Sequence, residues 1–199
     1  MNLRMVIPVQ IAVIGLLGAI YYGYHAVKGP EPQAKPDPTS RTASASPTPS
    51  PTPEIATTRL VSKRGGFAVG VPDDVKAKKV GPAVTMMSAD KVLSVVVAPV
   101  ESGPISVSSK AFMRGMKEIY TKVKVTRTET QTIDGKKATA TYGQARNAKK
   151  VQIRFVNFVV KSSPRNYAIN AFTTRESDPL FVLPRVNAIA NSFEVIKKP

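Results

Sequence analysis

The sequence contains no cysteine and no tryptophan, and its single histidine is His25. Without cysteine the chain cannot form a disulfide, a thiolate nucleophile, an iron–sulfur cluster or a cysteine-ligated zinc site. A lipid anchor on cysteine is excluded for the same reason. Because His25 lies in an apolar N-terminal stretch, the rest of the chain lacks the most common general base and metal ligand. We therefore expect no catalytic triad with histidine, no metal site and no cofactor.

Acidic residues are scarce, with 29 Lys and Arg against 13 Asp and Glu and a formal charge of +16. Four of the basic and three of the acidic residues precede residue 58, so residues 58–199 carry +15. That segment is long enough for one domain, which would bury about two-thirds of its unfolded surface. We predict a basic globular domain over 58–199.

A long apolar run follows a short N-terminal tail at 1–5. Residues 6–27 contain no charged side chain, and at about 1.5 Å per residue a helix of this length spans roughly 33 Å, enough to cross a bilayer. We predict an uncleaved transmembrane signal anchor. The alternative is a cleavable signal peptide, which is disfavoured because the run is long and no small-residue cleavage site follows closely.

Small residues recur every fourth position in this segment, at Gly15, Ala19 and Gly23. Such spacing lets two membrane helices approach closely, which would give a homodimer, although Gly and Ala are also common in membrane helices generally. The positively charged residues flanking the segment are nearly balanced and do not fix its orientation. The short N-terminal tail favours a single-pass cell membrane protein with its C-terminal domain extracytoplasmic.

Residues 28–57 have a different composition, with eight prolines, many Ser and Thr and few apolar residues. Such a chain favours extended polyproline II structure and cannot bury a core. We predict a disordered stalk between membrane and domain. Its SPTPSPTP run at 46–53 is similar to O-glycosylated spacers of actinobacterial proteins, and composition leaves open whether sugars are attached.

The pattern of apolar residues within 58–199 indicates an α+β fold. Strands are expected at 67–71, 83–88, 92–100, 123–133, 138–145, 151–160, 167–173 and 192–196. Asp134-Gly135 predicts a tight hairpin, and the apolar 92–100 run predicts a strand covered on both faces. One helix is expected to be capped by Ser108 and to bury a face extending to Val123. A second helical region is expected to begin at Ser177 or Asp178, with its regular part at 183–190, because Pro184 would remove a backbone hydrogen bond inside a longer helix. The result is a largely antiparallel sheet flanked by helices.

Three short segments carry a family resemblance: GFAVGVP at 66–72, IDGKKA at 133–138 and AIANSF at 188–193. Together they make residues 66–196 similar to the PsbP-like domains of actinobacterial envelope proteins, including the LpqN group. The resemblance implies a PsbP-like α/β/α sandwich, an exported protein, binding or assembly roles and no shared catalytic residues. Two features depart from the pattern: Val75 stands where an aromatic residue is common, and the anchor is a helix instead of a lipidated cysteine.

No motif assigns a reaction to the chain. Asp73-Asp74 is explained by a turn after Pro72. Ser88 and Lys91 match the spacing of a serine–lysine nucleophile, but they fall in an expected turn and the companion motifs are absent. The sequence predicts a protein that is not an enzyme. The alternative is an envelope hydrolase or ligand-modifying domain whose site forms only in the fold, and a pocket with converging acidic groups would favour it.

Basic residues are densest in three groups, for which we expect contact with an anionic ligand or membrane surface: Lys76, Lys78, Lys79, Lys136, Lys137, Arg146, Lys149 and Lys150. The partner would be an anionic wall polymer, an acidic lipid or an envelope protein. Alternatively, these charges only keep the domain soluble. Nucleic acid is disfavoured, because few aromatic residues accompany the basic groups. A further basic helix face, at Lys110, Arg114 and Lys117, is interpreted as solvated.

Overall fold

The computed structural model describes residues 55–174 and 177–196. The predicted signal anchor at 6–27, with Gly15, Ala19 and Gly23, and the stalk up to residue 54 lie outside the described residues. Among the helices that are described, none combines the length and the apolar character needed to span a bilayer.

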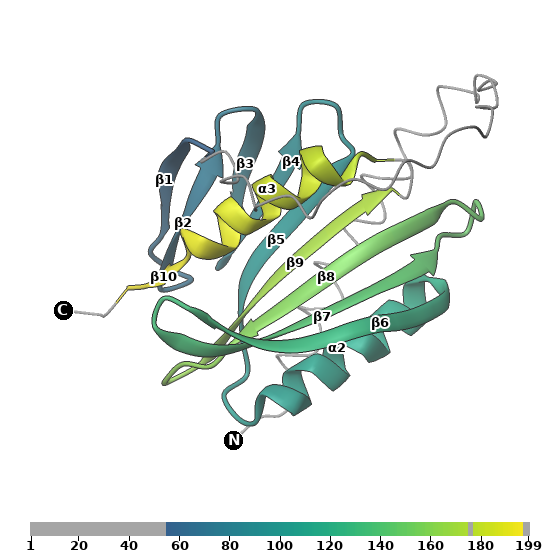
Figure 1. Ribbon diagram of the computed structural model, residues 1–199. Coiled ribbons are helices and arrows are strands. Elements are labelled where there is room, and N and C mark those ends of the chain that lie inside the picture. Colours follow the sequence, from purple (N-terminus) through teal and green to yellow (C-terminus); the bar gives the residue numbers. More distant parts are fainter. Residues whose placement is uncertain (1–54, 175–176, 197–199) are drawn as a thin grey trace, which may run out of the picture.

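The described strands form two antiparallel sheets (Figure 1). The smaller sheet has the order β1-β2-β10 and the larger one the order β3-β4-β5-β9-β8-β7-β6. Their bounds are β1 Thr57–Ser62, β2 Phe67–Pro72, β3 Val75–Val80, β4 Ala83–Ser88, β5 Leu93–Val100, β6 Thr121–Ile133, β7 Lys136–Arg146, β8 Gln152–Val160, β9 Asn166–Thr174 and β10 Glu194–Val195.

Two helices cover opposite faces of the seven-stranded sheet: α2 (Ile105–Ile119) and α3 (Pro179–Asn191). Phe112 and Met116 of α2 pack on one face, in a cluster with Phe155. Val186 and Ile189 of α3 pack on the other face, in a larger cluster that also includes the small sheet. This arrangement confirms the predicted α+β fold with helices on both sides. It also explains why β5 is a nearly continuous apolar run, since both of its faces are covered.

Three aromatic rings form the centre of the larger cluster. Phe67 of β2, Tyr167 of β9 and Phe193 after α3 lie with ring centroids 5.3 to 5.9 Å apart. The Tyr167 hydroxyl donates a hydrogen bond of 3.0 Å to the carbonyl oxygen of Gly66. Buried rings at these distances join the small sheet, the large sheet and the end of α3 into one core.

The helix α2 differs from its sequence prediction at both ends. It begins at Ile105 after Pro104, and Ser108 is a buried residue inside it, not its cap. It ends at Ile119, because Tyr120 is already extended (φ −118°, ψ 149°), and Val123 belongs to β6. The spacing of apolar residues predicted the buried face of the helix correctly. The same spacing continues past the end of the helix, because the apolar Val123 of β6 fits it.

The regular part of α3 was expected to begin near residue 183, after a helical start at Ser177 or Asp178, and the late start of the regular part was wrong. The helix begins at Pro179 and continues through Pro184. Proline at this position removes one backbone hydrogen bond. The Arg185 side chain supplies another one nearby, since its Nη1 donates to the carbonyl oxygen of Phe181 at 2.7 Å.

Two strands were not predicted, and the predicted strand at 192–196 contains only β10. The missed strands, β1 and β3, each lie at the edge of their sheet, and β3 is mostly exposed. The hairpin between β6 and β7 was predicted correctly: Asp134 (φ 52°) and Gly135 (φ 65°) both have the positive φ that a tight turn of this type requires.

Candidate anion-binding groove

An open groove of about 930 Å³ runs between α2 and the strands β6 and β7. Its wall comes from one side of the helix and its floor from the sheet face below. At one end it reaches the turn after β8, where Lys161 lies. The groove therefore combines segments from residue 105 to residue 161 that only the fold brings together.

The helix wall carries three cations. Lys110, Arg114 and Lys117 all line the groove, and their spacing of four and three residues places them on one side of a helix. The opposite side of α2 faces the core through Phe112 and Met116. The basic face interpreted as solvated from the sequence is exposed, and in addition it forms the wall of a concave surface.

The floor of the groove is built from threonine. Thr128 and Thr130 of β6 stand opposite Thr141 and Thr139 of β7 in the strand register. Alternation along a strand places all four on one sheet face. Among the described residues, none of these hydroxyls has a hydrogen-bond partner. Thr128 and Thr130 are exposed and Thr139 is half-buried, so their hydroxyls are available to water or to a ligand, whereas Thr141 is buried.

Two more lysines stand at the end of the groove near the start of α2. The Lys161 amide donates to the Lys137 carbonyl at 2.8 Å, which holds the two residues side by side. Lys161 Nζ also donates to the carbonyl of Gly103 at 2.6 Å. The first turn of α2 contains no acidic residue, so its positive dipole end adds to the charge of the lysines.

The polar character continues beneath the helix. Ser109 lines the groove, and its buried Oγ has no hydrogen-bond partner in the described structure. Asn157, 1% exposed, is the register partner of Thr141. Its Nδ2 donates to Asn170 Oδ1 at 2.6 Å, whereas its own Oδ1 has no donor among the described residues. Unpaired buried polar atoms of this kind are uncommon in native proteins.

The eight basic residues selected from the sequence do not form one site. The edge strand β3 carries Lys76, Lys78 and Lys79. The start of β7 carries Lys136 and Lys137, and at or beyond its opposite end lie Arg146, Lys149 and Lys150. The two ends of β7 are roughly 33 Å apart at about 3.3 Å per residue. Only Lys137 lines the groove, and Lys136 forms an ion pair with Asp134 instead.

Sequence reasoning missed Lys161 and the threonine floor. A partial signal was present, because threonine alternates with charged or polar residues along 126–132. Alternation alone does not show which face of a strand is covered. The pairing of β6 with β7 and the position of α2 were needed to identify the groove.

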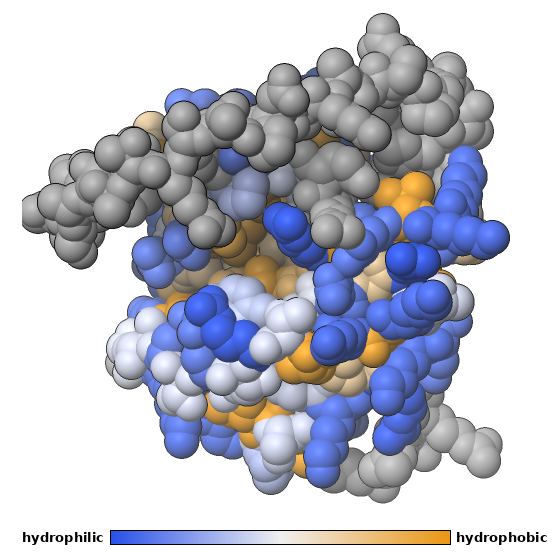
Figure 2. Space-filling view, turned by 45° about the vertical axis from the view of Figure 1, so that its right-hand side comes forward, coloured by the Kyte–Doolittle hydropathy of each residue, from blue (hydrophilic) through white to orange (hydrophobic). Residues whose placement is uncertain are grey.

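A smaller hollow of about 360 Å³ lies on the other face of the sheet, beside α3. Arg127 on its rim stacks 4.3 Å from the ring centroid of Tyr142, whose hydroxyl donates to Glu129 at 2.7 Å. Burial, and then the adjacent Glu129, raise the pKa of Tyr142 above its ordinary value. Figure 2 shows hydrophobic side chains coming to the surface between hydrophilic ones on the face that it displays.

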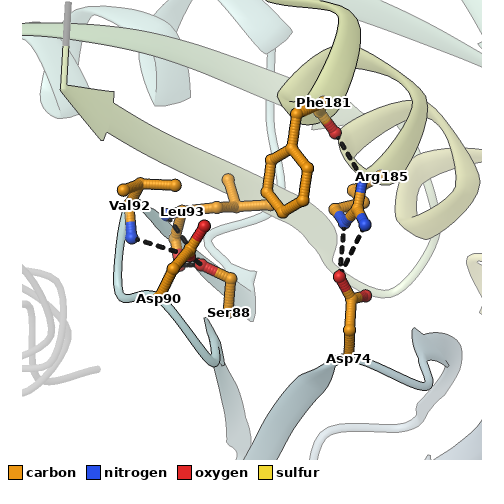
Figure 3. Close-up of polar contacts among 7 residues, drawn as sticks. All are labelled: Asp74, Ser88, Asp90, Val92, Leu93, Phe181 and Arg185. Carbon is orange, nitrogen blue, oxygen red and sulfur yellow. Dashed lines mark hydrogen bonds and ion pairs between the residues drawn. The ribbon is translucent and has the colours of Figure 1, made fainter. Parts of the chain in front are cut away.

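Ser88 and Asp74, which the sequence singled out, serve local structure (Figure 3). Ser88, 2% exposed, donates to Asp90 Oδ1 at 2.5 Å and accepts from the Leu93 amide at 3.0 Å. The turn predicted here is confirmed. Asp74, in the turn between β2 and β3, accepts hydrogen bonds of 2.8 and 2.6 Å from Arg185 of α3. Within the described ranges no group of three or more potential metal ligands occurs.

Comparison with known proteins defines the fold. No protein-family model matches the chain. No curated protein sequence matches it either. Among solved structures, the cyanobacterial PsbP of Synechocystis is similar, with a TM-score of 0.54, 14% identity and coverage of 74% of this chain and 97% of that one. The chain has a PsbP-like fold. The resemblance predicted from the three sequence segments is thereby confirmed at the level of fold.

Two further structures share the PsbP-like fold. LpqN of Mycobacterium tuberculosis gives a TM-score of 0.51 at 13% identity, with 73% of this chain and 93% of that chain covered. The Ran-binding protein Mog1p of Saccharomyces cerevisiae gives 0.53 at 10% identity, with 71% and 96% covered. At these identities, the likeness concerns the fold alone.

Proposed function

We propose that the chain is a non-enzymatic binding protein of the cell envelope whose PsbP-like domain holds an anionic polymer in the groove beside α2. One observation carries the proposal: five cations and no carboxylate line this groove among the described residues. A pocket with converging acidic groups would have favoured an enzyme instead. The described lining of the groove is basic instead.

Electrostatics favour a polymer as the ligand. A concave surface lined by charge of one sign raises the local concentration of counter-ions. A chain with several negative charges also releases bound cations when it docks, which adds to its affinity. A small anion would engage only part of a groove whose three helix cations alone extend over about 10.5 Å at 1.5 Å per residue.

The location in the envelope rests on separate support. The apolar segment 6–27 and the proline-rich stalk 28–57 suit a domain held away from the outer face of the membrane. The structurally similar LpqN is described as involved in cell envelope biogenesis. An extracytoplasmic domain of this kind would meet wall polymers and acidic headgroups, both of which are anionic.

The test compares two triple variants of the full chain in nanodiscs of neutral lipid. One carries Lys110→Gln, Arg114→Gln and Lys117→Gln on the groove wall. The matched control carries Lys76→Gln, Lys78→Gln and Lys79→Gln on β3 and loses the same charge. The probe is a short fluorescent oligomer of 1,3-propanediol phosphate, a polyanion without bases or hydroxyl side groups.

We expect the groove variant to lose roughly 100-fold in affinity, at about 1 kcal/mol for each cation near a polyanionic surface. The control should lose much less, since β3 lies outside the groove. The dependence of affinity on salt should also become shallower in the groove variant. Equal losses in both variants would reduce the effect to net charge and refute the groove as the site.

A further inference from the structure

The threonine floor has a regular geometry. Thr128 and Thr141 form one cross-strand pair, and Thr130 and Thr139 form the next. Directly opposed residues in an antiparallel pair lie about 5 Å apart, and residues two apart on a strand lie about 6.8 Å apart. The four hydroxyl-bearing side chains therefore form a two-by-two array on the floor of the groove.

The cations on the wall repeat at a similar interval. Lys110 and Arg114 are separated by about 6 Å along the helix axis, and Lys117 follows about 4.5 Å further. The helix lies over the same strands whose threonines form the floor. A ligand chain in the groove would thus meet a row of positive charges on one side and a row of hydroxyls on the other.

Unpaired polar atoms in the wall and beneath the floor add to the polar character of the groove. Ser109 Oγ is buried and lacks a partner, and Asn157 Oδ1, next to Thr141 in the register, lacks a donor among the described residues. An oxygen of a phosphate or carboxylate can only accept a hydrogen bond from the protein. A hydroxyl can both donate and accept, so it can pair with the threonine hydroxyls of the floor in either role.

Two other polyanions fit this surface poorly. A single-stranded nucleic acid binds largely by stacking its bases on aromatic rings, and no aromatic side chain is among the described residues that line the groove. An acidic peptide has carboxylates but no regular hydroxyls for the threonine array.

Resting on the proposed function, we propose that the groove recognises a hydroxylated polyanion, a chain of polyol or sugar units that carry negative charges. The five cations bind the charges, and the array Thr128, Thr130, Thr139 and Thr141 binds the hydroxyl groups between them. The groove would therefore distinguish two polymers of equal charge by their hydroxyls.

The test uses the full chain in neutral nanodiscs and two probes with the same phosphate spacing. One is a glycerol phosphate oligomer, with one free hydroxyl in each unit, and the other is the 1,3-propanediol phosphate oligomer, which has none. The variant is Thr128→Val, Thr130→Val and Thr139→Val, which removes hydroxyls and keeps shape and charge. The matching Thr→Ser triple variant retains the hydroxyls, and thermal unfolding verifies that each variant is folded.

We expect the original chain to bind the glycerol oligomer about tenfold more tightly, equivalent to about 1.4 kcal/mol. The valine variant should bind both probes equally, and the serine variant should keep the preference. An oligogalacturonate, with carboxylates and hydroxyls, tests the source of the charge: whichever hydroxylated probe binds more tightly identifies the anion. Should the valine variant fail to fold, the comparison of the two probes on the original chain still shows whether the groove recognises hydroxyl groups.

Two outcomes would overturn the proposal, and they differ in meaning. If the original chain binds both phosphate oligomers equally, and both need Lys110, Arg114 and Lys117, the anionic groove stands and the recognition of hydroxyls is wrong. If neither oligomer nor the oligogalacturonate binds, the proposed function itself is wrong.

Discussion

The two faces of the seven-stranded sheet are covered in different ways. On the α3 side, the sheet meets a helix and a second sheet, and large side chains such as Phe67 and Phe193 are fully buried between them. On the α2 side, one helix covers the sheet. Its Phe112 and Met116 pack on Phe155 and Phe172, whereas Ser109 and Lys110 border the polar groove.

This difference separates stability from recognition. Burial of large apolar side chains, the main source of folding free energy, is concentrated on the α3 side. The polar floor and exposed cations of the groove contribute little to it, because exposed charges and hydroxyls change stability by only a few tenths of a kcal/mol in most proteins. The groove can therefore vary in sequence without loss of the fold.

The largest effect should follow a change on the α3 side. Phe193→Ala removes a ring that is 1% exposed and contacts Phe67 and Tyr167. We expect it to lower the free energy of unfolding by about 3–5 kcal/mol, measured by urea denaturation. Thr128→Ala on the groove floor serves as the control and should change it by about 0.5 kcal/mol or less. Similar losses in the two variants would contradict the division between the faces.

An intermediate effect is expected where the α2 side is closely packed. A side chain on Gly143 of β7 would run into the Phe155 ring and lie 2.6 Å from the Lys124 carbonyl oxygen. Gly143→Ala should therefore cost about 1–3 kcal/mol of stability through overpacking, again measured by urea denaturation. An unchanged midpoint would mean that this end of the α2 side is as loosely filled as the groove.

The smallest effect concerns a contact between the hairpin and β10. Burial raises the pKa of Asp134, but hydrogen bonds from Lys136 and the Val195 amide, with the charge of Lys136, outweigh it and lower the pKa below 3.8. A lowered pKa means that ionised Asp134 stabilises the fold above its unfolded pKa, and this contribution is lost as the pH falls through the folded value.

Asp134→Asn keeps a residue that tolerates the positive φ of the turn and removes the charge. It should lower the melting temperature slightly at neutral pH, and the difference from the original chain should disappear in strong acid. Melting curves of both proteins across the acidic range test this. A difference that stays constant with pH would show that the charge of Asp134 has no part in it.

The sequence allowed much of the fold to be predicted, for reasons that can be named. The apolar runs of β2, β4 and β5 are strong local signals because these strands are largely buried. The Asp134-Gly135 hairpin is a strong signal because both residues tolerate the positive φ of the turn. The strand β3 was missed because lysines occupy an edge strand with little buried surface. The regular part of α3 was expected to start too late because the fold tolerates Pro184 inside this helix at the cost of one backbone hydrogen bond.

The candidate site was predicted only in part. Helical periodicity identified the basic face with Lys110, Arg114 and Lys117, but its partners depend on pairings between residues far apart in the sequence. Lys137 and Lys161 meet because β7 and β8 are antiparallel neighbours. Grouping lysines by their density along the chain joined residues at opposite ends of β7 and omitted Lys161.

The edge strand β3 has a consequence for encounters between two molecules of this protein. It is the outermost strand of the large sheet, so one of its sides has no neighbouring strand in that sheet. The strand carries Lys76, Lys78 and Lys79, which are all exposed. Lysines at such an edge oppose the addition of a strand from another molecule, because like charges would meet as the backbones paired. Two copies can therefore meet at high concentration without their sheets pairing into a continuous aggregate.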